Sequence, residues 1–270
     1  MYLKDCFTIN INMTLKINEW YGRFGNNIIQ LINSIEYCLQ NNYHKIIFPH
    51  HTFLETNYIL LKDNNDNNIV SKSGEFIYQL HINKIIDLTY NKIRKHFQKY
   101  IKPIVNIEIK KKIDVIGIHF RSGDIFSNCV HPYYIQPPYC YYQSIIDNIN
   151  KIKMFSEDLK NPCAYQFNID FQLNWMKNDF RKDLEEISQC NEIILSFSTL
   201  SIFIILMTDF EEIYVPDYMY NHFKERQYDL FDIIDNTKTK LNIVSLPNYI
   251  QPKQWKNTPQ QRQIMMNYKP

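Results

Sequence analysis

Polar residues with the chemistry of an anion site follow a short apolar run near the middle of the chain. The run Val115–Phe120 contains His119, and Arg121, Gly123 and Asp124 come directly after it. In an open α/β sheet the ligand lies beyond the carboxyl ends of the strands, so polar groups placed there can hold one. The guanidinium of Arg121 offers a fork of donors that suits two phosphate oxygens. Gly123 permits a close backbone turn, and Asp124 could orient the arginine or accept a proton. The alternative is a structural ion pair between Arg121 and Asp124.

A turn with two glycines, Gly22-Arg-Phe-Gly-Asn26, is the second candidate. A strand over residues 14–20 is expected before it, and apolar residues repeat after it at the spacing of one helix face. A strand, a tight turn and a helix in this order aim backbone N–H groups at whatever lies above the sheet. Glycines also occupy such turns for geometric reasons alone. The expected helix face consists of Ile28, Leu31, Ile32, Ile35 and Leu39.

Two hydroxyl residues stand at a third strand-to-helix junction. Residues 192–198 predict a strand, and an apolar helix is expected from Thr199 onward, so Ser198 and Thr199 would lie where that helix starts. They could cap the helix, or together with free N–H groups hold a phosphate. Asp183 is expected to begin the preceding helix, whose apolar residues repeat at intervals of three.

Strands and helices alternate on both sides of residue 103, which predicts an α/β protein with two Rossmann-like halves facing a cleft. The expected domains are 1–102 and 103–270, and residues 103–112 form the predicted hinge, since Pro103 ends a helix. The remaining expected strands are 45–49, 115–120, 151–159, 212–216 and 241–245, the remaining helices are 83–100, 141–149 and 259–266, and residues 63–68 are expected to form a polar loop.

Composition excludes several classes of protein. The chain has 270 residues, 45% of them hydrophobic and 21% charged, and its formal charge of +2 is too small to predict nucleic acid as a partner. Six scattered cysteines without a CxxC pair favour reduced thiols over a zinc site or a disulfide scaffold. The N-terminus lacks the apolar core of a signal peptide, and the most apolar stretch, residues 193–207, is too short to span a bilayer. We therefore expect a cytoplasmic protein with no membrane span.

Four motifs together resemble a known enzyme family. They are the turn Gly22–Asn26, His119-x-Arg121-x-Gly123-Asp124, Phe155-Ser-Glu-Asp158, and Asp183 followed by the run Cys190–Thr199. Their order resembles that of the inverting fucosyltransferases that use GDP-fucose, and the pattern is most similar to the α-1,2-fucosyltransferase family. The resemblance covers about residues 21–217 and implies a GT-B-type fold. It also implies transfer of L-fucose from GDP-fucose to a hydroxyl of a glycan acceptor, with galactose O2 as the expected position.

The resemblance assigns roles to individual residues. Arg121 would hold the β-phosphate and stabilise the leaving GDP, with His119 in the same pocket and Asp124 beside them as catalytic groups. Asp183 would accept hydrogen bonds from guanine. No obligatory divalent metal is implied, in keeping with the absence of a DxD motif near the donor site. The remaining expected donor-binding residues are Ser198, Thr199, Gly22, Arg23, Gly25 and Asn26.

The chain departs from the family pattern at three places and leaves the general base open. The turn usually reads Asn-Gln, whereas here it is Asn26-Asn27. Many members carry a second arginine where this chain has Ser122, and the Trp-Trp pair common in the α-1,2 group is replaced by Ile202-Phe203. Two alternatives therefore remain, a transferase that uses another GDP-sugar and a non-catalytic domain that binds a glycan or a nucleotide. The candidates for the base are Asp124, His131 and Glu157.

Overall fold

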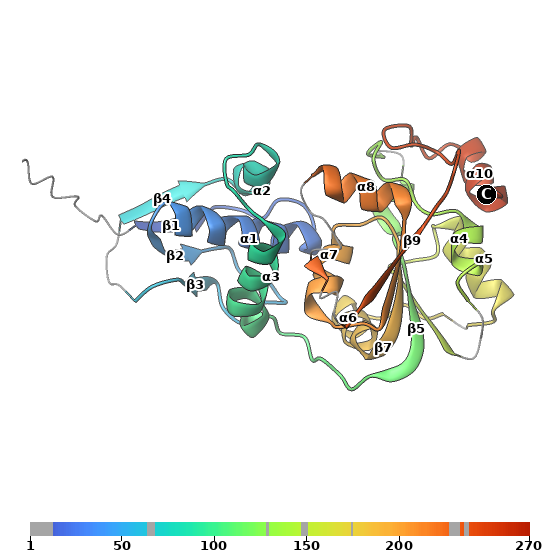
Figure 1. The fold of residues 1–270 in the computed structure, drawn as a ribbon, viewed down its shortest axis with the longest axis horizontal. Helices are drawn as coiled ribbons and strands as arrows, with labels where there is room; N and C mark the ends of the chain where they lie inside the picture. Colours follow the sequence, from blue (N-terminus) through green and yellow to red (C-terminus); the bar gives the residue numbers. More distant parts are fainter. Residues whose placement is uncertain are drawn as a thin grey trace, which may run out of the picture. The chain divides into compact units, whose positions relative to one another are not determined.

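The structure is a computed structural model, and its chain divides into two compact units, Met1–Asn106 and Ile107–Pro270 (Figure 1). The division falls four residues after the expected boundary at 102/103, and each unit is described by itself. The described residues are 13–63, 68–127, 130–146, 151–173, 175–226, 233–234 and 238–270.

The N-terminal unit is built on a four-stranded sheet of order β3-β2-β1-β4, in which β1 is parallel to β2 and to β4, and β3 is antiparallel to β2. Helix α1 buries Leu31, Ile32 and Ile35 completely, as the spacing of its apolar residues predicts. The elements are β1 (Met13–Ile17), α1 (Phe24–Gln40), β2 (Tyr43–Ile47), β3 (Tyr58–Leu60), β4 (Asn68–Lys72), α2 (Gly74–Ile82) and α3 (Tyr90–His96), followed by a π turn (Phe97–Ile101) and a 3-10 turn (Lys102–Ile104).

The sequence misplaced one helix of this unit and missed three elements. The predicted helix over 83–100 is wrong at its start. Helix α2 ends at Ile82 with Asn83 as its C-cap, Lys84 takes a positive φ of 56°, and the next helix begins only at Tyr90. Strands β3 and β4 and helix α2 were not predicted. Of the polar loop expected over 63–68, residues 64–67 lie outside the described residues and Asn68 begins β4.

The C-terminal unit contains a five-stranded parallel sheet of order β6-β5-β7-β8-β9. Counted within the unit, this is the order 2-1-3-4-5 of a doubly wound sheet, whose direction of winding reverses between its first and third strands. That reversal lies between β5 and β7. The elements are β5 (Ile113–Phe120), a 3-10 turn (Gly123–Phe126), α4 (Tyr139–Gln143), β6 (Ile152–Ser156), α5 (Pro162–Asp170), α6 (Phe180–Gln189), β7 (Cys190–Leu195), α7 (Leu200–Met207), β8 (Glu212–Pro216), α8 (Asp217–Glu225), β9 (Lys240–Val244) and α10 (Pro259–Asn267).

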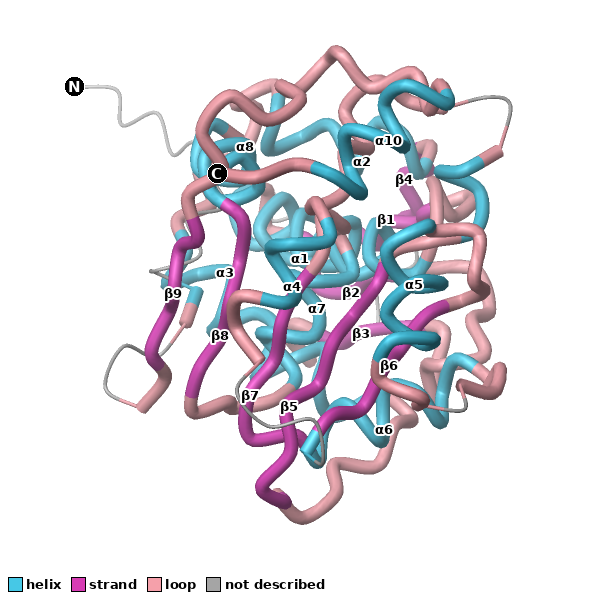
Figure 2. Tube along the Cα trace, turned by 90° about the vertical axis from the view of Figure 1, so that its right-hand side faces the viewer, coloured by secondary structure: helices cyan, strands magenta, loops and turns pink. Residues whose placement is uncertain are grey.

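Helices cover both faces of this sheet. Helices α4, α5 and α10 lie on one face and α6, α7 and α8 on the other, and Figure 2 looks onto the first of these faces. The α/β class is therefore confirmed. Helix α6 begins at Phe180 with Asp179 as its N-cap, so the expectation that Asp183 starts this helix is wrong; Asp179 accepts from the backbone N–H of Lys182 at 2.9 Å. Helix α4 ends at Gln143, earlier than the predicted 141–149, of which residues 147–150 lie outside the described residues.

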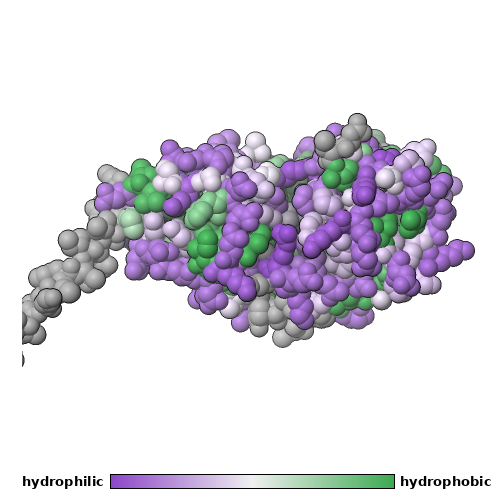
Figure 3. Space-filling model, turned by 90° about the horizontal axis from the view of Figure 1, so that it is seen from above, coloured by the Kyte–Doolittle hydropathy of each residue, from purple (hydrophilic) through white to green (hydrophobic). Residues whose placement is uncertain are grey.

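Apolar side chains fill the interior of each unit, and the surface in Figure 3 is mainly hydrophilic with scattered hydrophobic groups. In the C-terminal unit Phe120 packs against Tyr142 and Phe167, with ring centroids 4.3 and 5.6 Å away. Among the helices in the described ranges, none combines the length and apolarity that crossing a bilayer requires.

Two adjacent buried tyrosines of α4 differ in their hydrogen bonding. The Tyr141 hydroxyl lies 3.1 Å from the carbonyl oxygen of Leu195 and 2.9 Å from that of Tyr214, so it ties α4 to the ends of β7 and β8. The Tyr142 hydroxyl is buried and has no hydrogen-bond partner among the described residues. The first hydroxyl therefore stabilises the sheet, whereas the second is desolvated without compensation.

We expect Tyr141→Phe to lower the free energy of unfolding by ~1 kcal/mol, since it removes a buried hydrogen bond. Tyr142→Phe is the matched control in the same helix, and we expect it to leave stability unchanged or to raise it. Urea denaturation followed by circular dichroism measures both. Equal losses in the two variants would show that the Tyr141 hydroxyl contributes no bond of its own.

Candidate functional site

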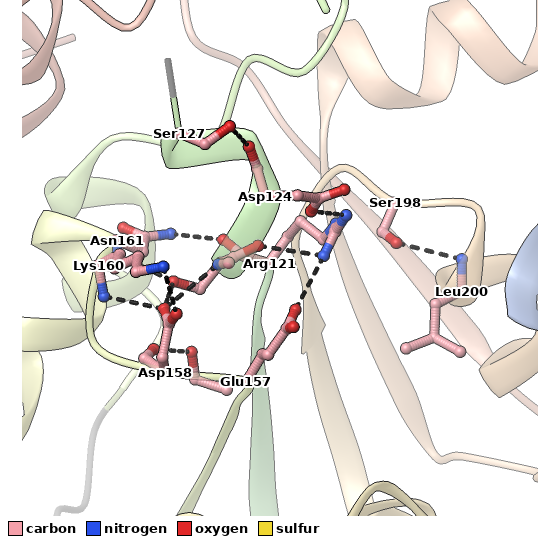
Figure 4. A network of polar contacts seen from close by, with 12 residues as sticks. Arg121, Asp124, Ser127, Glu157, Asp158, Lys160, Asn161, Ser198 and Leu200 are labelled. Carbon is pink, nitrogen blue, oxygen red and sulfur yellow. Dashed lines mark hydrogen bonds and ion pairs between the residues drawn. The ribbon is translucent and has the colours of Figure 1, made fainter. Parts of the chain in front are cut away.

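The carboxyl ends of β5, β6 and β7 bring the predicted polar residues to one edge of the sheet (Figure 4). Residues 119 of β5 and 195 of β7 are the last register partners of these two strands, and His119 also pairs with Phe155 of β6. Beyond this point the chain leaves β5 toward β6 and leaves β7 toward β8. Ligands of doubly wound sheets bind where neighbouring strands separate in this way. The geometry therefore places the candidate site around Arg121.

The backbone of Arg121 is held on both sides. Its N–H donates to the hydroxyl of Ser196 at 2.8 Å, and its carbonyl oxygen accepts from the side-chain amide of Asn161 at 2.9 Å. Both partners are completely buried. The same Ser196 hydroxyl lies 3.3 Å from Nδ1 of His119, which is itself buried. Arg121 thus extends from a fixed point at the strand end, and His119 supports it through Ser196.

The guanidinium of Arg121 lies between two carboxylates. Nη2 contacts Asp124, and Nη1 lies 3.4 Å from Glu157 and 3.1 Å from the carbonyl oxygen of Ser122. The Arg121 side chain is 14% exposed, while those of Asp124 and Glu157 are 55% and 42% exposed. The predicted Arg121–Asp124 pair is present, and Glu157 is a further partner. The arginine is the buried member of this group, and the two acids reach it from the solvent side.

Gly123 is required by its geometry. Its φ of 72° lies in the region that other residues rarely adopt, and a Cβ at this position would lie 2.4 Å from Oε2 of Glu157. Any side chain here would therefore push Glu157 away from Arg121. The close backbone approach expected of this glycine is made toward a carboxylate of the protein itself.

Ser122 fixes the loop after β6 to the end of β5. Its hydroxyl donates to Oδ1 of Asp158 and accepts from the backbone N–H of Asn161 at 3.0 Å. Burial alone would raise the pKa of Asp158, but hydrogen bonds from Ser122 and from the backbone N–H groups of Lys160 and Gly123 outweigh it and lower that pKa. Ser122 is 1% exposed. Position 122 is thus occupied by a buried structural hydroxyl.

Ser198 and Thr199 lie at the start of α7, as predicted. The Ser198 hydroxyl accepts from the backbone N–H of Leu200 at 3.2 Å, while the N–H groups of Ser201 and Ile202 donate to the carbonyl oxygens of Ser198 and Thr199. The Ser198 hydroxyl therefore caps the first turn of α7, which favours the capping interpretation for this residue, whereas the side chain of the N-cap residue Thr199 makes no cap hydrogen bond.

Asp183 lies in the first turn of α6, on the face of the sheet that also carries α7. Its Oδ1 accepts from the side-chain amide of Asn178 at 3.0 Å. Burial raises the pKa of Asp183 to about 6, and the neighbouring carboxylates of Glu186 and Asp179 add to the shift against the lowering effect of Asn178. Helix α6 ends where β7 begins, so its first turn is the part nearest the carboxyl edge. Asp183 is a poorly solvated carboxyl group that accepts one side-chain hydrogen bond, from Asn178.

The Gly22–Asn26 turn belongs to the N-terminal unit. Gly22 has a φ of 74°, and a Cβ there would lie 2.2 Å from the side-chain amide of Asn26. Arg23 is the N-cap residue of α1, and Gly25 is buried in its first turn. The turn is held by a residue outside the predicted set: the buried Gln30 amide donates to the Tyr21 carbonyl oxygen at 2.7 Å and accepts from its N–H at 3.3 Å.

Three residues that position predicted site residues, two in the C-terminal unit and one in the N-terminal unit, were not predicted. Ser196 and Asn161 fix the backbone of Arg121, and Gln30 fixes the glycine turn. Only Asn161 carried a readable signal, since Asn before Pro162 is typical of a helix start. In the described ranges no three His, Cys, Asp or Glu side chains gather closely enough to hold a metal ion.

No family model, no curated protein and no solved structure matches this chain. What the protein does must therefore be inferred from its own residues and their geometry.

We expect Asp183→Asn to stabilise the protein near pH 8 and to have no effect below about pH 4. A carboxyl whose folded pKa is raised from 3.8 to about 6 makes its full contribution to stability below pH 3.8 and loses it as the pH rises through 6. The amide removes this loss. Urea denaturation at pH 4 and pH 8 measures the difference. Thr258→Ala is the control, because it removes the uncharged N-cap of α10, and we expect its loss of ~1 kcal/mol at both values. A pH-independent effect of Asp183→Asn would contradict the assignment.

Proposed function

We propose that the protein is an inverting glycosyltransferase of GT-B type that transfers L-fucose from GDP-fucose to a hydroxyl of a glycan acceptor, with galactose O2 as the proposed position. The observation that carries the proposal is the fixed, largely buried guanidinium of Arg121 at the reversal point of a parallel sheet. Such a group suits a diphosphate, because it stays charged and can donate to two oxygens at once. GDP-fucose is the proposed donor because the order of the four motifs resembles that of the inverting fucosyltransferases that use it.

In the proposed reaction the acceptor hydroxyl attacks the anomeric carbon in line with the bond to the β-phosphate oxygen. That bond breaks as the new glycosidic bond forms, the bonding electrons leave with GDP, and the hydroxyl proton passes to a base. Arg121 stabilises the charge that develops on the diphosphate, which is electrostatic catalysis by a preorganised donor. Asp183 is proposed to accept from the N1–H and N2–H groups of guanine, and His119 keeps Arg121 in place through Ser196.

Glu157 is the strongest candidate for the base. Its carboxylate is 42% exposed and shares Arg121 with Asp124, but its contact of 3.4 Å is the looser of the two. A diphosphate that binds Arg121 would displace this carboxylate first. Freed from the guanidinium, the Glu157 carboxylate would be available to take the proton of the acceptor hydroxyl. His131 lies in the loop after β5 with its ring stacked on Tyr133, at 5.5 Å between centroids.

A non-catalytic nucleotide-binding domain is the second candidate, and the pairing of Arg121 with two acids of its own chain favours it. A transferase for another GDP-sugar would share the Arg121 and Asp183 roles. Turnover distinguishes the binding domain from the enzymes, and competition between GDP-sugars distinguishes the enzymes from each other.

We expect GDP and GDP-fucose, but not UDP, to raise the melting temperature, and Arg121→Ala to abolish the shift. A ligand at 100 times its dissociation constant stabilises the folded state by ~2.7 kcal/mol, which melting detects readily. Lys160→Gln is the control, because Lys160 lies 3.6 Å from Asp158 in the same loop system. The shift in melting temperature with each nucleotide is measured for both variants, and circular dichroism verifies that they are folded. GDP binding by Arg121→Ala at the native affinity would refute the role of this arginine.

We expect Glu157→Gln and Asp124→Asn to change GDP affinity in opposite directions. Glu157→Gln removes the competitor of the diphosphate and should tighten GDP binding several-fold while lowering kcat by about 100-fold or more, as loss of a general base does. Asp124→Asn removes the tighter partner that orients the guanidinium, and it should weaken GDP binding. Isothermal titration calorimetry and initial rates measure both. Unchanged kcat in Glu157→Gln would exclude this residue as the base.

A further inference from the structure

A cluster of cations and aromatic rings surrounds Tyr133 in the C-terminal unit. The guanidinium carbon of Arg226 and the ammonium of Lys253 each lie 5.8 Å from the centroid of the Tyr133 ring. The rings of His131 and His222 lie 5.5 and 5.3 Å from the same ring. These five residues form what we call the Tyr133 patch. They come from the loop after β5, from the end of α8 and from the segment after β9.

The patch is held at the carboxyl edge of the sheet by buried contacts. The His222 ring packs edge-on against Phe197, which follows β7, at 5.0 Å. The backbone N–H of the buried Trp255 donates to the carbonyl oxygen of Pro132 at 3.3 Å, which brings the segment after β9 to the loop after β5. Lys253 itself has a φ of 74°, an uncommon conformation for a residue with a side chain. The fold therefore brings together the segments of the chain that carry the two cations.

Among the described residues, neither Arg226 nor Lys253 has an ion pair with an acidic side chain, although each lies within cation–π distance of the Tyr133 ring. Burial lowers the pKa of His222 to about 4, and Arg226 and His131 add to that effect, so His222 is neutral near pH 7. Two cations held near one aromatic ring repel each other, and an anion that contacts both would relieve that repulsion. A cation–π contact at an exposed site contributes only ~0.5–1 kcal/mol and does not account for the arrangement.

We propose that the Tyr133 patch binds an anionic group, that is, a sulfate, carboxylate or phosphate on a sugar or a nucleotide. Arg226 and Lys253 offer charge-assisted donors for this anion, while the His131 ring stacks on Tyr133. The patch contains none of the side chains Arg121, Asp124 and Glu157, and it does not rest on the proposed transferase function.

The test compares the double variant Arg226→Gln/Lys253→Gln with Lys224→Gln. Lys224 lies on the same helix, is exposed, and has its ammonium 5.5 Å from the Tyr220 ring, so its replacement removes a similar charge outside the patch. The probes are a sulfated heparin disaccharide, neutral lactose, and GDP, each titrated by calorimetry at low ionic strength. We expect the sulfated disaccharide to bind the native protein and Lys224→Gln alike. The double variant should bind it at least about tenfold more weakly, since charge-assisted hydrogen bonds are lost.

The three probes separate the possible outcomes. If GDP, and not the disaccharide, loses affinity in the double variant, the anion site stands and its ligand is a nucleotide. The proposal is overturned if neither anionic probe distinguishes the double variant from Lys224→Gln, or if lactose binds the patch as tightly as the sulfated sugar. Binding of the disaccharide without any binding of GDP would overturn the proposed transferase function and leave the Tyr133 patch intact.

Discussion

The site depends on how the backbone of Arg121 is satisfied where two parallel strands separate. The ladder between β5 and β7 ends with the pair His119 and Leu195, so the N–H of Arg121 lies beyond the last paired residue of β7. A buried donor left without a partner costs ~1–3 kcal/mol, so the chain must supply one. Ser196, the residue after β7, does so, and the side-chain amide of Asn161 donates to the carbonyl oxygen of Arg121 from the other side. Two buried side chains thus fix the position from which the guanidinium extends, and a site carried by such a rigid scaffold keeps its geometry before a ligand arrives.

The magnitude of the ion pairs decides whether the acids around Arg121 block an anion. Each pair involves a carboxylate that is about half exposed, and such pairs contribute only ~0–1 kcal/mol because water solvates the acid well. A diphosphate with two negative charges and several acceptor oxygens can replace one of them at small cost. The same acids keep the guanidinium compensated while the site is empty. The two interpretations of Arg121 are therefore compatible: it pairs with the acids when no ligand is bound, and an anion can take the place of one acid on binding.

The parts of the fold that could be predicted are those in which the type of each residue indicates directly whether that residue is buried or exposed. The buried parallel strands of the C-terminal unit are continuous apolar runs, and Arg121 and Gly123 stand out because they end one of them. Strands β3 and β4 gave no such signal: β3 buries a single residue, Ile59, and none of the β4 residues is fully buried. Ser196 could not be singled out either, because its role depends on a backbone N–H 75 residues away. Long-range partners of this kind are fixed by the register of the strands.

The Tyr142 hydroxyl and the Asp183 carboxylate both lower the stability of the C-terminal unit, but the reasons for their presence differ. The Tyr142 hydroxyl is sealed inside the core without a partner, so only the packing of its ring accounts for it. Asp183 is half-buried, keeps one hydrogen bond, and loses stability whenever it ionises. A ligand with paired N–H donors would supply the bonds that this carboxylate lacks, and binding energy would then offset the desolvation. Binding sites often contain a partly desolvated charge of this kind. The charge lowers the stability of the protein without ligand, and a ligand that donates hydrogen bonds to it gains affinity from the same group.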